Sequence, residues 1–253
     1  MILRRDLVTI PCLSDNYAFA FRSGDRVAVV DVPEAGPVLD ALAERGWRAT
    51  DILLTHHHPD HVQGVAEVVA ATGAAVWGAA ADAHRLPPLN HALAPGDAVA
   101  IGSETGRVID VSGHTVGHIA FLFDGVAFTG DSLMAAGCGK LFEGTPAQMH
   151  ASLGRFADLP GDTLIASGHE YTSSNLAFAL SLEPDHAALI SRRAEVERRR
   201  AEGVPSVPSD LGTERRTNPY LRVHEPALKA ATGTTGQSDE ETFAAVRRAK
   251  DAY

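Results

Sequence analysis

Cysteine is almost absent from this chain, since only Cys12 and Cys138 occur among 253 residues. Two thiols are too few for a disulfide framework, and this scarcity is typical of proteins in a reducing compartment. The N-terminal segment also lacks the apolar stretch and small-residue cleavage site of a secretory signal peptide, and no apolar run has the length of a membrane span. We therefore expect a cytoplasmic protein without a membrane partner.

Basic residues are scarce as well, with 22 Lys and Arg against 32 Asp and Glu and a formal net charge of −10. A nucleic-acid-binding surface requires concentrated positive charge, so no nucleic-acid partner is expected. A few well-placed cations can still dominate the local electrostatic field, so the net charge does not exclude a small anionic substrate.

Apolar residues make up 45% of the chain and form short runs bounded by Gly, Asp or Pro. Such runs predict strands, here at residues 17–23, 26–32, 51–56, 74–79, 98–102, 106–112 and 118–131. Helical patterns stand between or after them at residues 36–46, 61–73 and 145–162. Thr145 is the expected N-cap of the last of these, with Pro146 at its first helical position.

From Thr172 onward the sequence changes character. Two helices separated near Pro184 are predicted, followed by an irregular connection at residues 203–219 and a helical tail. The chain is therefore predicted to comprise an α/β domain at residues 1–171 and a smaller helical domain at residues 172–253.

The segment "THHHPDHVQG", residues 55–64, concentrates four histidines and an aspartate. A strand is predicted to arrive at His56, and alternate side chains of an extended chain share a face, so His56 and His58 can converge while His57 points away. Asp60 and His61 follow in the turn that opens the next helix. Imidazole nitrogen and carboxylate oxygen are ligands that zinc and similar divalent metals prefer.

Three further ligand types follow apolar strands elsewhere in the chain. His114 stands in "VSGHTVGHI", Asp131 in "AFTGDSL" and His169 in "LIASGHEY". Each match is weak alone, but together with the histidine cluster they predict a metal site built on loops along one edge of a sheet.

With these residues in this order, the chain resembles the metallo-β-lactamase superfamily, and within it most closely the hydroxyacylglutathione hydrolases, or glyoxalase II. The resemblance spans nearly the whole chain: "LSDNYAF", "LLTHHHPDH", "SGHTVGHIAF", "FTGDSL", "GCGKLFEGT", "SGHEYTSSNLAFA", "NPYLR" and "RRAKD". It implies a four-layered αβ/βα sandwich at residues 1–171. A helical, substrate-binding domain that helps close the active site would follow at residues 172–253.

The resemblance also implies two divalent metal ions per chain. Three residues would bind the first ion: His56, His58 and His114. Three would bind the second: Asp60, His61 and His169. One carboxylate, Asp131, would bridge both. Zinc is the expected metal, and iron and manganese tolerate the same ligands.

Such a metal pair predicts a hydrolase. Two divalent ions lower the pKa of a shared water to give a hydroxide, and a metal stabilises the oxyanion that forms when this hydroxide attacks a carbonyl. Neither cysteine is needed as a nucleophile, and Asp60 is the expected catalytic residue that orients the hydroxide. The resemblance implies hydrolysis of S-D-lactoylglutathione and related thioesters to D-lactate and glutathione, the second step of methylglyoxal detoxification.

Substrate-binding candidates also follow from the resemblance. They are Lys140, Phe142, His169, Glu170, Tyr171, Arg247 and Lys250. Positive charges and a hydroxyl donor suit the carboxylates and peptide carbonyls of glutathione. Some relatives carry Tyr in place of Phe142, and Ala249 stands where a charged residue is common, which bears on affinity rather than on reaction class.

Two other interpretations stay open. A persulfide dioxygenase with a single iron shares the fold and most ligands, but relatives of that kind generally lack the long helical extension. In a non-catalytic binding module braced by metal, each ion would be closed by four ligands, often cysteines. A β-lactamase would be exported, and an RNA-processing nuclease would need a basic surface. The expected partner is a small-molecule glutathione thioester, bound by a monomer.

Overall fold

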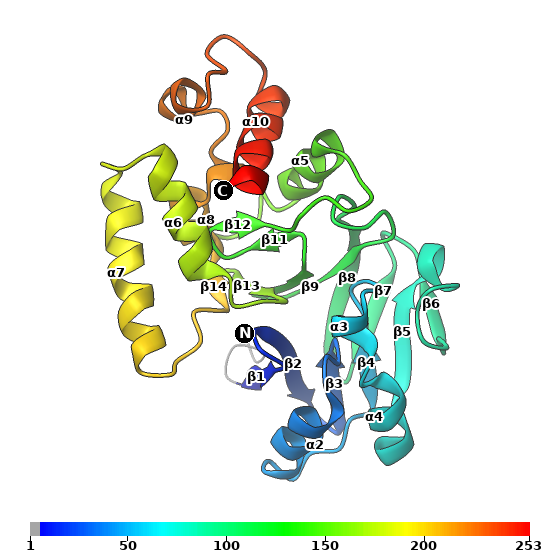
Figure 1. The fold of residues 1–253 in the computed structure, drawn as a ribbon. Helices are drawn as coiled ribbons and strands as arrows, with labels where there is room; N and C mark the ends of the chain where they lie inside the picture. Colours follow the sequence, from blue (N-terminus) through cyan, green and yellow to red (C-terminus); the bar gives the residue numbers. More distant parts are fainter. Residues whose placement is uncertain (1–5) are drawn as a thin grey trace. The chain divides into compact units, whose positions relative to one another are not determined.

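The computed structural model describes residues 6–253, which fall into two compact units. The first unit holds the described residues up to Val111 together with Gly117–Gly130 and Ala166–His169. The second unit holds Ser112–Val116, Asp131–Ile165 and Glu170–Tyr253. Figure 1 shows the elements of both, coloured along the sequence. Residues 1–5, the start of the predicted first domain, lie outside the described residues.

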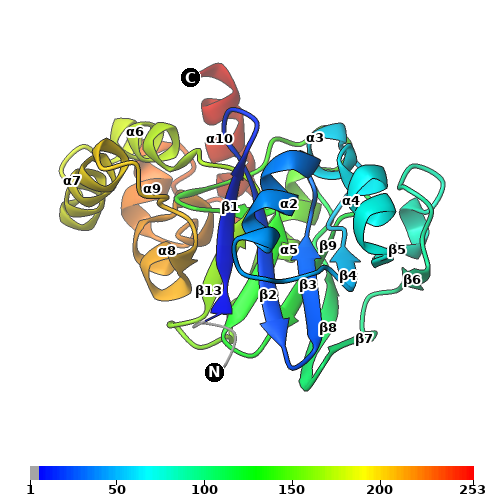
Figure 2. The ribbon, with the colours of Figure 1, turned by 90° about the horizontal axis from the view of Figure 1, so that it is seen from below.

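The first sheet of the first unit has six strands arranged in chain order. They are β1 (Val8–Cys12), β2 (Asn16–Ser23), β3 (Arg26–Val30), β4 (Asp51–Leu53), β5 (Ala75–Ala79) and β6 (His91–Leu93). The first three pair antiparallel, and β3 to β6 pair parallel. Parallel neighbours need crossover connections. These contain α2 (Ala35–Ala43), α3 (Pro59–Val62), α4 (Val65–Thr72) and the short 3-10 helix η1 (Ala80–Asp82). Figure 2 shows α2 in front of this sheet.

The second sheet of the first unit is antiparallel along β7, β8, β9 and β10, and β13 lies next to β10. Its strands are β7 (Ala98–Ile101), β8 (Glu104–Asp110), β9 (Ile119–Phe123), β10 (Val126–Gly130) and β13 (Leu164–Ser167), of which the last two residues of β13 belong to this unit.

Aromatic side chains fill the space between the two sheets. Phe21 of β2 lies 5.1 Å from Phe123 of β9 and 5.7 Å from Phe128 of β10, measured between ring centroids. Phe19 lies 5.9 Å from Phe128 in the same way. These rings are almost fully buried, so the two sheets form a sandwich whose core is apolar and whose strand ends carry the polar residues.

The second unit consists mainly of helices. Its helices are α5 (Pro146–Gly154), α6 (Thr172–Leu182), α7 (Ala187–Ala201), α8 (Leu211–Thr217), η2 (Pro219–Leu221), α9 (Pro226–Ala231) and α10 (Asp239–Ala252). A small hairpin of β11 (Leu133–Met134) and β12 (Gly137–Cys138) and the short strand β14 (Ser209–Asp210), which pairs with β13, complete it. The contact between α6 and α7 is apolar and includes Leu176, Ala179, Leu189 and Val196.

Most elements expected from the sequence are present. Strands occur in all seven predicted segments, the break between α6 and α7 falls at Pro184, and Thr145 caps α5 through a capping box with Gln148. Strand β1 was not anticipated. Among the described residues, no helix is long and apolar enough to cross a membrane.

Two predicted segments were wrong. The helix expected at residues 61–73 is two helices, because the Gly64 N–H donates to the Val32 carbonyl and ends α3 there. A Cβ at Gly64 would lie 2.7 Å from the Ala35 nitrogen, so only glycine allows this close approach. The connection expected to be irregular at residues 203–219 contains β14 and α8.

Candidate metal centre

The histidine-rich segment starts where β4 ends, and backbone hydrogen bonds keep the chain extended there. His56 Nε2 lies 3.2 Å from His58 Nδ1. His57 Nδ1 lies instead 3.2 Å from an oxygen of the buried Asp82. As the alternation of an extended chain predicts, His56 and His58 share a face and His57 points away from them.

A buried carboxylate behind this segment, that of Asp31, holds two of the histidines. Its Oδ1 accepts a hydrogen bond of 2.8 Å from the Thr55 N–H, and its Oδ2 accepts one of 2.8 Å from the Thr55 hydroxyl. The same Oδ2 lies 2.8 Å from His61 Nδ1, and Thr55 Oγ1 lies 3.0 Å from His56 Nδ1. Asp31 has a φ of +55° and follows β3, so its left-handed backbone is part of this arrangement.

These contacts determine where the imidazole protons lie. An ionised carboxylate can only accept, so the proton between Asp31 and His61 is on Nδ1 of the ring. The Thr55 hydroxyl has one proton and donates it to Asp31, so it accepts from the Nδ1–H of His56. Both rings therefore present Nε2 as a lone pair, the form in which imidazole binds a metal.

Three acceptor atoms converge beside this point. His61 Nε2 lies 3.3 Å from His169 Nε2, and Asp60 Oδ2 lies 3.5 Å from His169 Nε2 and 3.9 Å from His61 Nε2. The proton of His169 is on Nδ1, which lies 2.9 Å from Asp15 Oδ1. Three acceptors at these separations repel one another unless a cation lies among them. Ligands bound at ~2.1 Å with tetrahedral angles are ~3.4 Å apart, so the residues fit a divalent metal.

His114 and Asp131 form a similar pair within the second unit. His114 Nδ1 lies 2.7 Å from the carbonyl oxygen of Lys140, which again leaves Nε2 as a lone pair, and this Nε2 lies 3.5 Å from Asp131 Oδ2. Both side chains are buried. A Cβ at Gly139 would lie 1.9 Å from the Asp131 carbonyl oxygen, so any residue with a side chain would clash at this position.

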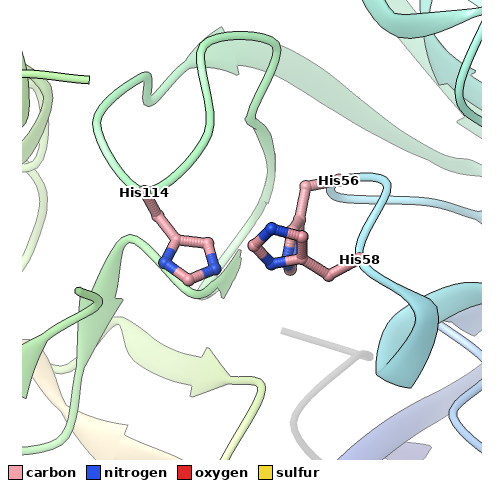
Figure 3. Close-up of side chains that lie close together, drawn as sticks. All are labelled: His56, His58 and His114. Atoms are coloured by element: carbon pink, nitrogen blue, oxygen red, sulfur yellow. The ribbon is translucent and has the colours of Figure 1, made fainter. Parts of the chain in front are cut away.

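The ligand-type atoms form groups in which every atom lies within 4.8 Å of the others. Figure 3 shows His56 and His58 close together on the segment that follows β4. One group, within the first unit, is Asp60, His61 and His169. Asp31 also groups with His56 and His61, but its oxygens already accept hydrogen bonds from Thr55 and His61, so it orients ligands. Asp60, His61 and His169 are the residues to which the resemblance assigns the second ion, and their role as its ligands stays a prediction.

Known proteins match nearly the whole chain. A family model described as the metallo-beta-lactamase superfamily matches residues 14–169, and one described as hydroxyacylglutathione hydrolase C-terminus matches residues 170–253. A Cereibacter sphaeroides protein named hydroxyacylglutathione hydrolase is 62% identical over 98% of this chain and 99% of its own length. A Fuscovulum blasticum protein of the same name is 60% identical with the same coverage.

This chain belongs to the hydroxyacylglutathione hydrolase family. Solved structures agree on its fold, an α/β sandwich of the metallo-β-lactamase type with a helical C-terminal part. The BLEG-1 B3 metallo-β-lactamase is 21% identical with a TM-score of 0.66, over 85% of this chain and 99% of its own. ETHE1 from Myxococcus xanthus is 23% identical with a TM-score of 0.66, over 96% and 89% of the two chains. TTHA1623, solved in a di-iron-bound form, is 27% identical with a TM-score of 0.60, over 85% and 99%.

The side chains that the hydroxyacylglutathione hydrolase resemblance assigns to substrate binding differ in exposure. Phe142 and Tyr171 are exposed, and Lys140 Nζ lies 5.6 Å from the centroid of the Phe142 ring. The Phe142 ring also meets that of His114 nearly edge-on, at 5.3 Å. Lys140 and Phe142 are thus placed together beside one metal-ligand candidate.

Two other candidates, Glu170 and Arg247, are engaged by the protein itself. The Glu170 carboxylate accepts hydrogen bonds from the N–H and hydroxyl of Ser206. Arg247 is 6% exposed, donates to the carbonyl oxygen of Cys138 and lies 2.9 Å from Asp251. Their roles toward glutathione stay predictions of the hydroxyacylglutathione hydrolase resemblance.

Lys250, the last candidate, lies on the C-terminal helix α10. Its ammonium donates to the backbone oxygen and hydroxyl of Ser174, both at 3.3 Å, and lies over the rings of Phe178 and Tyr253. Burial, and then the charge of Arg247, lowers the pKa of Lys250. Part of this side chain therefore packs on α6, with its charge kept at the surface.

Several residues of the centre were missed by sequence reasoning. Asp31 and Thr55 were not singled out, because an aspartate after a strand is common and a threonine before the histidines carries no ligand signal. Asp15 and Asn16 stood in "LSDNYAF", a hydroxyacylglutathione hydrolase motif to which no role was given. His118 is fully buried and stacks on His56 with centroids 4.6 Å apart. In the sequence, the feature that could have drawn attention to His118 was its position four residues after His114.

Proposed function

We propose that this chain hydrolyses S-D-lactoylglutathione and related 2-hydroxyacyl glutathione thioesters to D-lactate and glutathione. Its membership in the hydroxyacylglutathione hydrolase family and the names of its relatives support this thioester hydrolase activity. The observation that carries the proposal is the convergence of Asp60 Oδ2, His61 Nε2 and His169 Nε2, three acceptors arranged for a metal ion.

Two divalent metal ions per chain complete the proposed site. The first would be held by His56, His58 and His114, the second by Asp60, His61 and His169, and Asp131 would bridge both. When bound, such a pair supplies a water of lowered pKa and a positive field for the developing oxyanion. Zinc is the proposed metal, and iron or manganese suits the same nitrogen and oxygen set.

The protein's own contribution is to fix the ligands before the substrate arrives. Asp31, Thr55, Asp15 and the Lys140 carbonyl hold four rings in the Nδ1–H form, so no ring has to change its proton. Asp60 is the proposed catalytic residue that orients the attacking water. Its side chain is 42% exposed, which leaves one side of the carboxylate open to solvent.

Substrate binding is proposed for Lys140, Phe142, His169, Glu170, Tyr171, Arg247 and Lys250. The positive groups suit the carboxylates of the tripeptide, and the exposed Phe142 offers an apolar surface. We further propose a domain boundary between residues 171 and 172, a monomeric state, and action in the cytoplasm on a small molecule, without nucleic-acid or membrane partners.

The first experiment measures thioester absorbance as purified protein loaded with two zinc equivalents turns over S-D-lactoylglutathione. We expect hydrolysis that disappears on chelation and that falls by about 10²- to 10⁴-fold in Asp60→Asn, because a positioned proton-handling group contributes on that scale. His84→Ala is the matched control, since His84 is exposed and belongs to none of the metal-type groups among residues 6–253.

Failure to hydrolyse the thioester, by protein that elemental analysis shows to hold two metals, would contradict the proposal. Oxygen consumption with glutathione persulfide and iron would then identify the persulfide dioxygenase alternative. Tight metal binding with neither activity would favour the non-catalytic binding module.

A further inference from the structure

The turn between β1 and β2 carries two polar residues, Asp15 and Asn16, in the motif "LSDNY". The turn is closed by the pairing of Cys12 with Asn16, and Leu13 within it has a φ of +50°. A leucine in the left-handed region is uncommon and is maintained only when its surroundings determine it. The turn therefore has a defined shape that places the two polar side chains.

Backbone contacts tie this turn to the segment that carries a metal-ligand candidate. The Tyr17 N–H donates to the Gly168 carbonyl at 2.8 Å, and Asn16 forms an antiparallel bridge with His169. Gly168 in turn donates to the carbonyl of Gly130 at the end of β10. His169 thus lies beside Asp15 and Asn16 because of main-chain pairing, and the side-chain contacts among them are built on a fixed frame.

Asp15 acts on His169 through charge and geometry. Its Oδ1 lies 2.9 Å from His169 Nδ1, and its Oδ2 accepts a hydrogen bond of 3.1 Å from the Ser14 hydroxyl. A carboxylate on Nδ1 holds the imidazole in one tautomer and makes Nε2 a more basic ligand. The Asp15 side chain is 37% exposed, so solvent and salt weaken this effect.

Asn16 acts on Asp60. Its amide Nδ2 donates to both the backbone oxygen of Asp60, at 3.0 Å, and the carboxylate Oδ2, at 3.1 Å. Both partners can only accept, so the amide must face them with its nitrogen. Asn16 is 4% exposed, and its hold keeps the half-exposed Asp60 carboxylate directed at His169 and His61 instead of at solvent.

We propose that Asp15 and Asn16 are positioning residues that set the affinity of the second metal position and thereby the metal stoichiometry of the enzyme. The inference rests on the proposed two-metal function. Of the three residues proposed for that position alone, two are held by this one turn. The first position draws on other contacts, because His56 is oriented by Thr55 and Asp31.

The experiment titrates metal-depleted protein with zinc in competition with a chromophoric chelator. The variants are Asp15→Asn and Asn16→Ala, and the control is Asp25→Asn, an exposed aspartate in the turn between β2 and β3. We expect each test variant to bind its second zinc equivalent about 10- to 100-fold more weakly, as removal of such supporting groups typically does. The first equivalent is expected to bind as in the control.

A second readout separates positioning from general stability. Long-range ¹H–¹⁵N spectra of the histidine rings are expected to show His169 protonated at Nδ1 in the metal-depleted wild type and a mixture of tautomers in Asp15→Asn. The melting temperature of this variant is expected to match that of the Asp25→Asn control. If Asn16→Ala proves too unstable, Asp15→Asn alone decides.

The inference would be overturned if the test variants bound each of the two zinc equivalents as tightly as the control does. A uniform loss of both equivalents would also overturn it, since the proposal requires selectivity for one position. Failure of the proposed function is a separate result, because it would appear in the wild type, as the absence of thioester hydrolysis by protein that holds two metals.

Discussion

Thr55 is the residue through which the Asp31 carboxylate, which contacts His61 directly, also orients His56. Asp31 contacts His61 directly and His56 through the Thr55 hydroxyl, so ligand candidates of both proposed metal positions share one anchor. Thr55 is 1% exposed, so these hydrogen bonds are shielded from solvent. The Thr55 hydroxyl therefore sets the tautomer of the His56 ring by accepting a hydrogen bond from its Nδ1–H.

Replacing Thr55 with Val removes this link at almost constant volume. We expect Thr55→Val to weaken the first metal position about 10- to 100-fold and to lower activity at limiting metal, because His56 Nδ1 loses its acceptor. The free energy of unfolding should fall by roughly 1–3 kcal/mol, the cost of buried groups left without partners. Zinc titration and urea unfolding measure the two effects.

Thr105→Val is the matched control for that substitution, since Thr105 is exposed on strand β8. Unchanged zinc affinity in Thr55→Val would show that His56 keeps its orientation through packing, for example against His118.

Residue types alone revealed the ligand candidates, but their supports were invisible. Imidazoles and carboxylates at close spacing indicate metal chemistry in any fold. Asp15 and His169 are 154 positions apart, and only the backbone bridge between Asn16 and His169 brings them together. No local pattern encodes such a contact.

At the level of elements, a buried ion pair joins α7 to α8. Arg192 of α7 donates to the Glu214 carboxylate and, at 2.5 Å, to the Thr217 hydroxyl. Glu214 is fully buried and also accepts from the Ala136 N–H at 2.8 Å. The charges are satisfied only as a set, so removing one partner leaves the other unpaired in the interior.

Arg192→Met tests this anchor. We expect the free energy of unfolding to fall by about 3–5 kcal/mol, because Glu214 would stay buried without its cation. The neighbouring Arg193→Met is the control: Arg193 is exposed and pairs with Glu197 at the surface, so little loss of stability is expected. Urea unfolding of both variants checks the contrast, and equal losses would contradict it.

Element boundaries show what periodicity can and cannot predict. Strands with buried apolar runs were evident, because few other structures use Val, Ile and Phe in that way. The helix over residues 61–73 was predicted as one, yet the pairing of Gly64 with Val32 divides it. Helix α8 was missed because its sequence, "LGTERRT", has no apolar stripe and is held by Arg192 and Asn218 around Glu214.

For the whole molecule, the two buried thiols make stability depend on pH. Desolvation by burial raises the pKa of Cys12, and likewise that of Cys138, from 9.0 to about 11. Between these values the unfolded chain has lost protons that the folded chain keeps. The stability contributed by each thiol is therefore fully present below pH 9 and is lost as pH rises toward 11.

We expect the free energy of unfolding to decrease between about pH 9 and pH 11, and to decrease less steeply in a Cys12→Ala, Cys138→Ala double variant. Urea unfolding at intervals across this range measures both slopes. Identical slopes would mean that the thiols titrate alike in both states. Burial, and then the charge of Cys138, raises the pKa of Tyr220 in the same direction, so this tyrosine adds to the decrease.

The sequence by itself determined the reaction chemistry and the order of the sheet-forming segments. Whether a residue can bind a metal depends on its side chain, and an apolar run is a property of a short segment, so both can be recognised in the sequence without a structure. The tertiary structure decided which nitrogen of each ring faces the site and which residues hold it there. Those choices depend on hydrogen bonds between strand ends far apart in the chain, such as Asp15 with His169, and these form only once the sheets have paired.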